Sequence, residues 1–376
     1  MKFVKHIARI LVGITFIFSG FVKGIDPWGS SYKFTDYFHS MGLDWLVWAA
    51  FPLGILLSFA EFAIGVALLF NVFLRFFSWL ALLFMLFFTG LTLWIAITNP
   101  VTDCGCFGDA LVISNWETFY KNVVLIILTI IIFVYRKNMK HLVNKKIPYS
   151  LSAATIVVYI GVVIYSYNHL PIIDFRPYKV GVNIPEAMSY PDDAPKDVYE
   201  NIFYYRNLNT GEVQRFTEEN YPWQDTLNWE FDNMESNLVQ EGYKPPIHDL
   251  TITTPDGEDI KDFFLYDENY VFMLVSHNLE KTCTKNQNKL NELANWALNN
   301  EMEFICLTSS LPEQSAEFAE EHNAPYEFFN TDEITLKTMI RSNPGLMILK
   351  DGTIVAKYHY NDIPTPEEFQ EEFMNK

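Results

Sequence analysis

The chain has 376 residues, half of them hydrophobic, and a formal net charge of −18. Residues 1–168 hold 12 Lys/Arg and 7 Asp/Glu (+5), whereas residues 169–376 hold 15 and 38 (−23), and the two values sum to −18. This division excludes a single globular core, a coiled coil and a disordered chain. The acidic balance also argues against nucleic-acid binding, which needs positive charge to displace counterions from phosphate.

Five apolar stretches in the first part reach the length of about 20 residues that a membrane span requires. They cover residues 4–22, 45–70, 76–98, 117–135 and 150–167. The first stretch follows Lys2, Lys5 and Arg9, as in a secretory signal peptide, but no small-residue cleavage site comes after it. We therefore predict a retained helix and a chain that spans the lipid bilayer five times.

The basic residues of the loops predict the orientation. If the N-terminus is cytoplasmic, nine basic residues lie inside and three lie outside. The inner set is Lys2, Lys5, Arg9, Arg75, Arg136, Lys137, Lys140, Lys145 and Lys146, and the outer set is Lys23, Lys33 and Lys121. This positive-inside asymmetry predicts an inner-membrane protein whose acidic C-terminal part is periplasmic.

Two loops share that outer side. Residues 23–44 are long enough for a short interfacial helix, and residues 99–115 contain two of the four cysteines, Cys104 and Cys106. The segment FSGFVKGIDP at residues 18–27, together with Glu61, resembles the DoxX-like membrane family. The CGCFG loop that starts at Cys104 is similar to the related MauE-like family, which is associated with methylamine-dehydrogenase maturation and disulfide handling. The resemblance covers about residues 1–136 and implies a four-helix bundle with a redox loop on its outer face.

The remaining boundaries follow from composition and pattern. Residues 137–168 form a basic cytoplasmic loop and a fifth, tethering helix, and residues 169–244 form a linker with a β-hairpin at 201–206 and 212–216. From residue 245 onward, strands and helices alternate, as expected for an α/β domain. The expected strands are 249–253 and 257–260 (a hairpin), 270–276, 303–307, 346–349 and 354–358. The expected helices are 284–299, 312–322, 333–341 and one after Pro364, and a segment at 326–329, to which no strand is assigned, precedes Asp332.

The order of these elements resembles the thioredoxin-like fold in its membrane-tethered, TlpA-like branch. The segment SNPGLMILKDG, residues 342–352, matches that family's cis-proline strand and hairpin, which makes Pro344 a fold-critical residue. The family's C-x-x-C should open the helix after 270–276, but the sequence there is EKTC. Cys283 fits the second cysteine position and Glu280 stands at the nucleophile's position, so the domain is predicted to be degenerate.

Three interpretations of Cys104 and Cys106 stay open: a thiol–disulfide pair, a structural or merely packed pair, and a metal site. One intervening residue lets the two Cα atoms lie at most about 7 Å apart, at the upper edge of bridgeable separations, and Gly105 lets the backbone fold and shorten the gap. A disulfide that closes so small a ring adds little to stability, which favours a redox-active pair over a structural one. A metal site is the least favoured of the three, because the pair lacks the His partners of common metal sites, and no metal ligand is assigned.

Glu61 lies midway in the second span, where an ionisable group is costly and marks a polar site within a bundle. It can pair with Lys23, relay a proton, contact a quinone head group, or simply hydrogen-bond to a neighbouring helix. A quinone is the one cofactor that the sequence suggests. Cys283 at a helix N-terminus would have a lowered pKa and form mixed disulfides, or else be a relic. Cys306 within a strand is expected to be a buried, inert thiol.

The sequence thus predicts a membrane all-α bundle, four DoxX/MauE-like helices and a fifth tethering helix, with a C-terminal α/β thioredoxin-like domain at residues 245–376. The predicted role is thiol–disulfide or quinone-linked redox handling, or protein maturation, at the periplasmic face, with a periplasmic or membrane protein as partner. The site would contain Cys104, Cys106, Glu61 and Cys283. The alternative is a non-enzymatic envelope scaffold, and the sequence does not decide whether the chain is an enzyme.

The basic asymmetry generates a topology prediction. A reporter fused after Lys146 should be cytoplasmic, and one fused after Asp174 should be external, because the fifth helix lies between them. Paired alkaline-phosphatase and fluorescent-protein fusions measure this directly. If both reporters were found on the same side of the membrane, the predicted fifth span would be contradicted.

Overall fold

The computed structural model describes residues 2–101, 103–139, 146–191 and 193–375. Lys140 and Lys145 of the basic cluster, and the side chain of Lys2, lie outside the described residues. The chain divides into two compact units, one formed by residues 1–182 and 250–376 and the other by residues 183–249.

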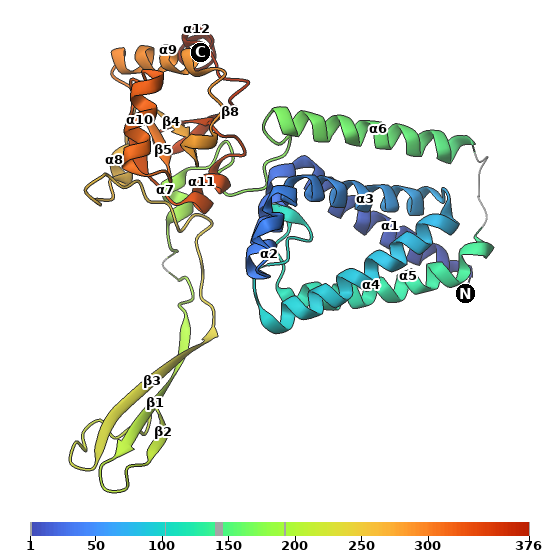
Figure 1. Cartoon of the computed structure of the whole chain (residues 1–376), viewed down its shortest axis with the longest axis horizontal. Coiled ribbons are helices and arrows are strands. Elements are labelled where there is room, and N and C mark those ends of the chain that lie inside the picture. Colours follow the sequence, from blue (N-terminus) through green and yellow to red (C-terminus); the bar gives the residue numbers. More distant parts are fainter. Residues whose placement is uncertain (1, 102, 140–145, 192, 376) are drawn as a thin grey trace. The chain divides into compact units, whose positions relative to one another are not determined.

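Five helices are long and apolar enough to cross a membrane (Figure 1). They are α1 (Lys2–Ile25), α3 (Ala50–Phe70, preceded by a 3-10 segment at Asp44–Ala49), α4 (Leu74–Thr98), α5 (Asn115–Tyr135) and α6 (Lys146–Asn168). All five predicted spans are therefore confirmed, with ends that differ by a few residues. Large apolar side chains such as Phe87 and Val124 are more than half exposed, as expected of a surface that contacts lipid chains. The chain is a membrane protein.

Glycine residues let α1 and α3 approach closely. A Cβ added at Gly20 of α1 would lie 2.5 Å from the backbone nitrogen of Phe62, and one at Gly65 of α3 would lie 2.5 Å from that of Ile17. Small residues at such an interface allow membrane helices to pack backbone to backbone. This close contact brings the C-terminal half of α1 against the middle of α3.

The expected interfacial helix is α2 (Pro27–Ser40), which starts where the Asp26 side chain accepts a hydrogen bond from the Gly29 backbone N–H. Contacts place α2 beside the cysteine loop: Lys33 forms an ion pair with Asp103 at 2.7 Å. The loop ends at α5, whose first turn is closed by a capping box of Ser114 and Glu117.

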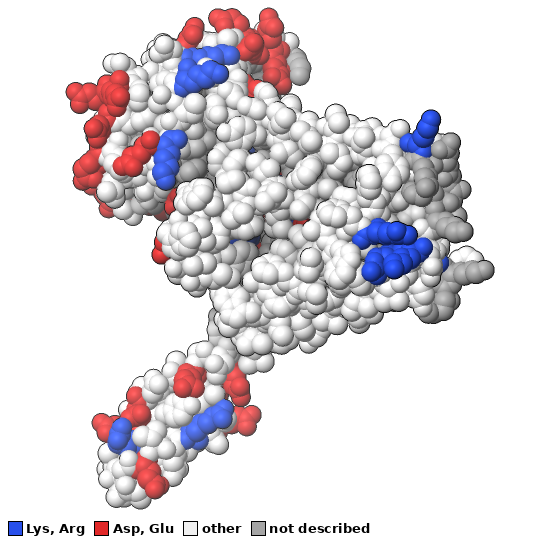
Figure 2. Space-filling model, turned by 45° about the vertical axis from the view of Figure 1, so that its right-hand side comes forward, with Lys and Arg blue, Asp and Glu red and all other residues white. Residues whose placement is uncertain are grey.

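The fifth helix packs on the bundle as well as tethering the C-terminal part. The Tyr159 hydroxyl of α6 donates to the Gly20 carbonyl oxygen at 3.1 Å, and its ring stacks on Phe62 with centroids 4.1 Å apart. Figure 2 shows a bundle body almost free of charged side chains in this view, with Lys and Arg gathered at one end and acidic groups prominent on the C-terminal parts. This distribution agrees with the composition of the two parts of the sequence.

The C-terminal part of the first unit is an α/β domain, as predicted. Its five strands lie in the order β6-β5-β4-β7-β8. Strands β4, β5 and β6 are parallel, β7 is antiparallel to β4, and β8 is antiparallel to β7. The strands are β4 (Tyr270–Val275), β5 (Glu303–Thr308), β6 (Glu327–Asn330), β7 (Gly345–Lys350) and β8 (Thr353–His359). The helices are α8 (Lys261–Leu265), α9 (Gln287–Asn299), α10 (Pro312–His322), α11 (Glu333–Met339) and α12 (Pro366–Phe369). This architecture is consistent with the thioredoxin-like expectation, and the Asn343–Pro344 peptide bond is cis.

Two expectations for this domain are wrong in detail. The hairpin at 249–253 and 257–260 is reduced to an isolated bridge between Thr253 and Asp259, because Thr253 also pairs with Asn330 and the Asp259 carboxylate accepts the Ile252 N–H. The helix expected at 284–299 begins at Gln287. Cys283 therefore precedes the helix instead of opening it, and its backbone N–H donates to the Asn343 carbonyl oxygen at 2.9 Å.

The second unit, residues 183–249, contains the short helix α7 (Ile184–Met188) and a three-stranded antiparallel sheet in the order β2-β1-β3. Strands β1 (Val198–Asn207) and β2 (Val213–Thr217) confirm the predicted hairpin. Strand β3 (Trp229–Gln240) was not predicted, because nearly all of its side chains are exposed and its sequence lacks the alternation of a half-buried strand.

Candidate functional site

A buried ion pair lies between α1 and α3. The Lys23 ammonium is 2.9 and 2.8 Å from the two carboxylate oxygens of Glu61, and the two residues are only 8% and 6% exposed. Ser19, one turn before Lys23, accepts from Lys23 at 3.0 Å and lies 2.9 Å from Glu61 Oε2. The pairing of Glu61 with Lys23 that the sequence suggested is confirmed.

The cysteine loop lies against this ion pair. Ser19 Oγ is 2.7 Å from the carbonyl oxygen of Cys106, and the Tyr37 hydroxyl of α2 donates to the carbonyl oxygen of Cys104 at 2.9 Å. Lys33 holds Asp103. Polar contacts thus attach the loop to α1 at Cys106 and to α2 at Asp103 and Cys104. The loop has no regular secondary structure at these residues.

The two thiols are in contact, with their Sγ atoms 2.7 Å apart. Gly105 between them has a φ of +63°, in the left-handed region that glycine adopts without steric cost. A Cβ at this position would lie 3.0 Å from the Lys33 side chain, and the Gly105 N–H donates to Asp103 at 2.8 Å. The glycine therefore folds the loop so that both sulfur atoms face each other.

The two thiols differ electrostatically. The hydrogen bond from the Cys106 thiol lowers the pKa of Cys104 to about 6, against the opposing effect of burial, and Thr118 and Lys121 add to the decrease. The same bond, together with burial, raises the pKa of Cys106. The pKa values of the two thiols are thus shifted in opposite directions, the kind of asymmetry on which thiol–disulfide exchange depends.

A cavity of about 490 Å³ borders both the ion pair and the cysteines. Lys23, Glu61, Cys104 and Cys106 supply part of its polar wall. Most of the apolar lining comes from α2, α3 and α4, with Phe34, Phe38, Leu53, Leu57, Phe88 and Leu91 among the residues. Residues of the segment 171–176, which follows α6, also line the cavity. A cavity of this size with a few polar groups has the character of a small-molecule site.

The other candidate residues lie elsewhere. Cys283 belongs to the α/β domain and is partly exposed between the 3-10 segment Leu279–Lys281 and α9. Cys306 in β5 is fully buried, which raises the pKa of its thiol. Within the described residues, no three His, Cys, Asp or Glu side chains are arranged to hold a metal ion.

Ser19, Tyr37 and Thr118 were not singled out from the sequence. Ser19 stands four residues before Lys23 and is therefore on the same helix face, which is a usable signal once Lys23 is known to be buried. Tyr37 and Thr118 are brought to the cysteines by tertiary packing, and their sequence neighbours give no indication of this.

Residues 1–135 match the family described as Methylamine utilisation protein MauE. The MauE match contains Lys23, Glu61 and both loop cysteines, and it confirms that part of the expected resemblance, while the DoxX-like resemblance stays a prediction. Residues 199–241 match a domain of unknown function (DUF8463), which covers the three-stranded sheet of the second unit. The chain matches no curated protein and no solved structure.

The asymmetry of the thiols generates a prediction for alkylation. In the Cys283→Ser background, iodoacetamide should modify Cys104 with a half-maximal rate near pH 6, because only the thiolate reacts and its pKa is lowered to about 6. The rate should be level above pH 7, whereas an ordinary thiol with a pKa of about 8.5 continues to accelerate there. Cys106→Ala should move the midpoint upward, and a midpoint near 8.5 in the parent protein would contradict the assignment.

The ion pair generates a prediction for stability. Lys23→Met leaves the Glu61 carboxylate buried without its partner, a loss of about 3–5 kcal/mol for a buried pair. The double variant Lys23→Met/Glu61→Leu removes both charges and should recover most of the thermal stability lost in the single variant. Thermal unfolding in detergent, followed by tryptophan fluorescence, measures the difference. Equal melting temperatures for Lys23→Met and the parent protein would show that the pair is not a buried interaction.

Proposed function

We propose that Cys104 and Cys106 form a redox-active pair that carries out thiol–disulfide exchange with a partner protein at the periplasmic face of the inner membrane. The contact of the two thiols on the wall of a membrane cavity is the observation that carries this proposal. The name of the matched family associates it with methylamine utilisation, and an accessory role in the maturation of another protein suits a membrane-bound thiol pair.

The pair has the properties that exchange requires. Cys104 is the nucleophile because its pKa is lowered, and Cys106 is the resolving thiol. In the oxidising direction, the two thiols of a partner become a disulfide while the Cys104–Cys106 disulfide is reduced to two thiols. A disulfide that closes a ring across one residue adds little to the stability of the fold. Such a bond is therefore better suited to repeated oxidation and reduction than to a structural role.

A membrane quinone is the oxidant that fits the adjacent cavity. The apolar wall suits a lipid-soluble ring, and the Lys23 ammonium, which lines the cavity beside Glu61, is the group that would donate a hydrogen bond to a quinone carbonyl oxygen. A quinone supplies two-electron chemistry: it takes up two electrons and two protons as Cys104 and Cys106 become a disulfide. The reaction therefore balances without any further reactant.

Glu61 is placed to manage protons in this scheme. It hydrogen-bonds to Lys23 and lies next to Ser19, which contacts the backbone of Cys106. This buried chain of polar groups connects the cavity wall with the loop. We propose that Glu61 passes a proton between the thiol pair and the cavity.

A second candidate function is binding of a protein by the C-terminal part, without redox chemistry. It is favoured by the sheet of residues 183–249, where Tyr199, Phe231, Met234 and Leu238 are 47–54% exposed. In the antiparallel pairing of β1 with β3, Tyr199 lies opposite Leu238 and Tyr205 lies opposite Phe231. The Glu280 side chain, at the position of the missing nucleophile, is bound by Gln314 at 2.7 Å, which agrees with a degenerate redox site in this domain.

Reduction of a short-chain quinone by the purified full-length chain tests the redox proposal. The protein is reduced with a phosphine in nanodiscs, freed of reductant, and mixed with ubiquinone-1 while the quinone absorbance is followed. One quinone should be consumed for each Cys104–Cys106 pair, with both cysteines recovered as a disulfide.

Cys104→Ser/Cys106→Ser should consume none, and Cys283→Ser, which leaves the loop unchanged, should behave as the parent protein. Glu61→Gln should react more slowly if it passes protons. No quinone reduction by the parent protein would refute the quinone-linked proposal. Permanently reduced loop thiols in cells would leave only the binding function.

A further inference from the structure

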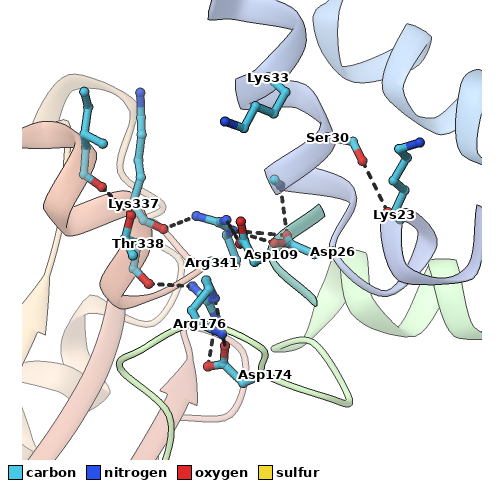
Figure 3. A network of polar contacts seen from close by, with 12 residues as sticks. Lys23, Asp26, Ser30, Lys33, Asp109, Asp174, Arg176, Lys337, Thr338 and Arg341 are labelled. Atoms are coloured by element: carbon cyan, nitrogen blue, oxygen red, sulfur yellow. Dashed lines mark hydrogen bonds and ion pairs between the residues drawn. The ribbon is translucent and has the colours of Figure 1, made fainter. Parts of the chain in front are cut away.

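Arg341 connects the α/β domain to the membrane part of the same unit (Figure 3). It follows α11 and is 6% exposed. Its Nε donates to both oxygens of Asp26, the N-cap residue of α2, at 3.1 and 2.8 Å, and its Nη2 donates to Asp109 at 2.9 Å. One side chain of the α/β domain therefore binds two carboxylates of the membrane part.

The surroundings of Arg341 fix this geometry. Its remaining nitrogen donates to the Lys337 carbonyl oxygen, and its guanidinium lies over the Tyr32 ring, 5.2 Å from the centroid. Gly29 leaves room for the Asp26 contact, because a Cβ there would lie 2.4 Å from Asp26 Oδ2 and 3.1 Å from Arg341 Nη2. A planar, always charged guanidinium suits such two-carboxylate binding in a way that an ammonium does not.

The charges of the cluster depend on one another. Burial would lower the pKa of Arg341, but Asp26 and Asp109 more than offset this and raise it. Burial raises the pKa of Asp109, while Arg341 acts in the opposite direction and Asp26 adds to the increase. Without the guanidinium, two carboxylates would face each other with no cation between them, so removal of Arg341 should displace one of them.

Asp109 lies close to the cysteine pair in the loop. It lies three residues after Cys106, and the Gly108 N–H donates to the Gly105 carbonyl oxygen at 3.1 Å, which closes a tight turn around Cys106. In the described part of the loop, Lys33–Asp103 is the ion pair before the cysteines and Arg341–Asp109 is the one after them. The two pairs thus hold the loop before and after the cysteines in the sequence, and Asp26 and Asp109 also line the cavity.

We infer that Arg341 is a positioning residue of the Cys104–Cys106 pair: the α/β domain, which lacks a dithiol site of its own, uses this side chain to hold the loop with its two sulfur atoms in contact. The domain would then act on the redox pair through Asp109 and not through Cys283. This inference rests on the proposed redox function for its biological meaning, but its test does not depend on turnover.

The test is the pH dependence of Cys104 alkylation in full-length protein, in the Cys283→Ser background. Arg341→Gln should raise the midpoint by one pH unit or more, because a loop released at Asp109 separates the thiols and Cys104 loses the hydrogen bond from Cys106. Asp109→Asn breaks the same pair from the loop side and should give a shift in the same direction. Arg341→Lys keeps the positive charge but lacks the planar guanidinium that binds two carboxylates at once. Its midpoint should lie between those of Arg341→Gln and the parent protein.

Lys357→Gln is the matched control. Lys357 is a comparably buried cation of the same domain, but it binds Asp174 and the Tyr178 carbonyl oxygen, both at 2.7 Å, and not the loop. It should leave the Cys104 midpoint unchanged even if it lowers thermal stability. If Arg341→Gln fails to accumulate, Asp109→Asn and Arg341→Lys decide the question.

An unchanged midpoint in Asp109→Asn and in the accumulating Arg341 variants would overturn the inference, as would an equal shift in Lys357→Gln. Failure of quinone reduction with a clear Arg341-dependent shift would instead refute only the proposed redox function. The two outcomes are therefore distinguishable.

Discussion

The buried Lys23–Glu61 ion pair imposes the main constraint on the membrane part of this protein. Two opposite charges within a bilayer are tolerated only when they meet with good geometry, and here the ammonium contacts both carboxylate oxygens. That geometry needs α1 and α3 to touch, which Gly20 and Gly65 permit. Ser19 then extends the polar group to the backbone of Cys106, so the position of the cysteine loop follows from the position of the ion pair.

The same principle operates at the end of the bundle that carries α2, where Arg341 bridges Asp26 and Asp109. A second group of charges, Arg176, Asp174 and Lys357, ties the segment after α6 to the α/β domain, and Arg176 also donates to the Thr338 carbonyl oxygen. Three cations and three carboxylates thus balance one another. The α/β domain lacks a cysteine pair of its own, but it is joined by buried charges to the loop that has one.

The sequence predicts the spans well because membrane helices need about 20 apolar residues and interruptions are conspicuous. It also predicts most strands and helices of the α/β domain, where apolar runs alternate with amphipathic segments. It fails at β3, which is exposed on both faces, and at the start of α9, where Cys283 lies in the preceding loop because its N–H bonds to Asn343.

Within the candidate site, Cys104, Cys106 and Glu61 can be chosen from the sequence because cysteines one residue apart and a carboxylate within a span are both uncommon. Lys23 follows as the nearest opposite charge. Arg341 and Asp109 could not be paired in this way, because they are 232 residues apart and each resembles an ordinary surface charge. The cavity likewise results from the arrangement of α2, α3 and α4, and no local pattern of residues predicts it.

In the proposed function, Cys104 and Cys106 alternate between dithiol and disulfide in the membrane protein. The most direct measurement is differential alkylation of untreated cells followed by mass spectrometry of the peptide that contains both residues. Cells with normal quinone should yield mainly the disulfide form, two hydrogen atoms lighter than the dithiol, and quinone-depleted cells should yield mainly the doubly alkylated dithiol. A pair that is fully reduced, or fully oxidised, in both kinds of cell would contradict the account.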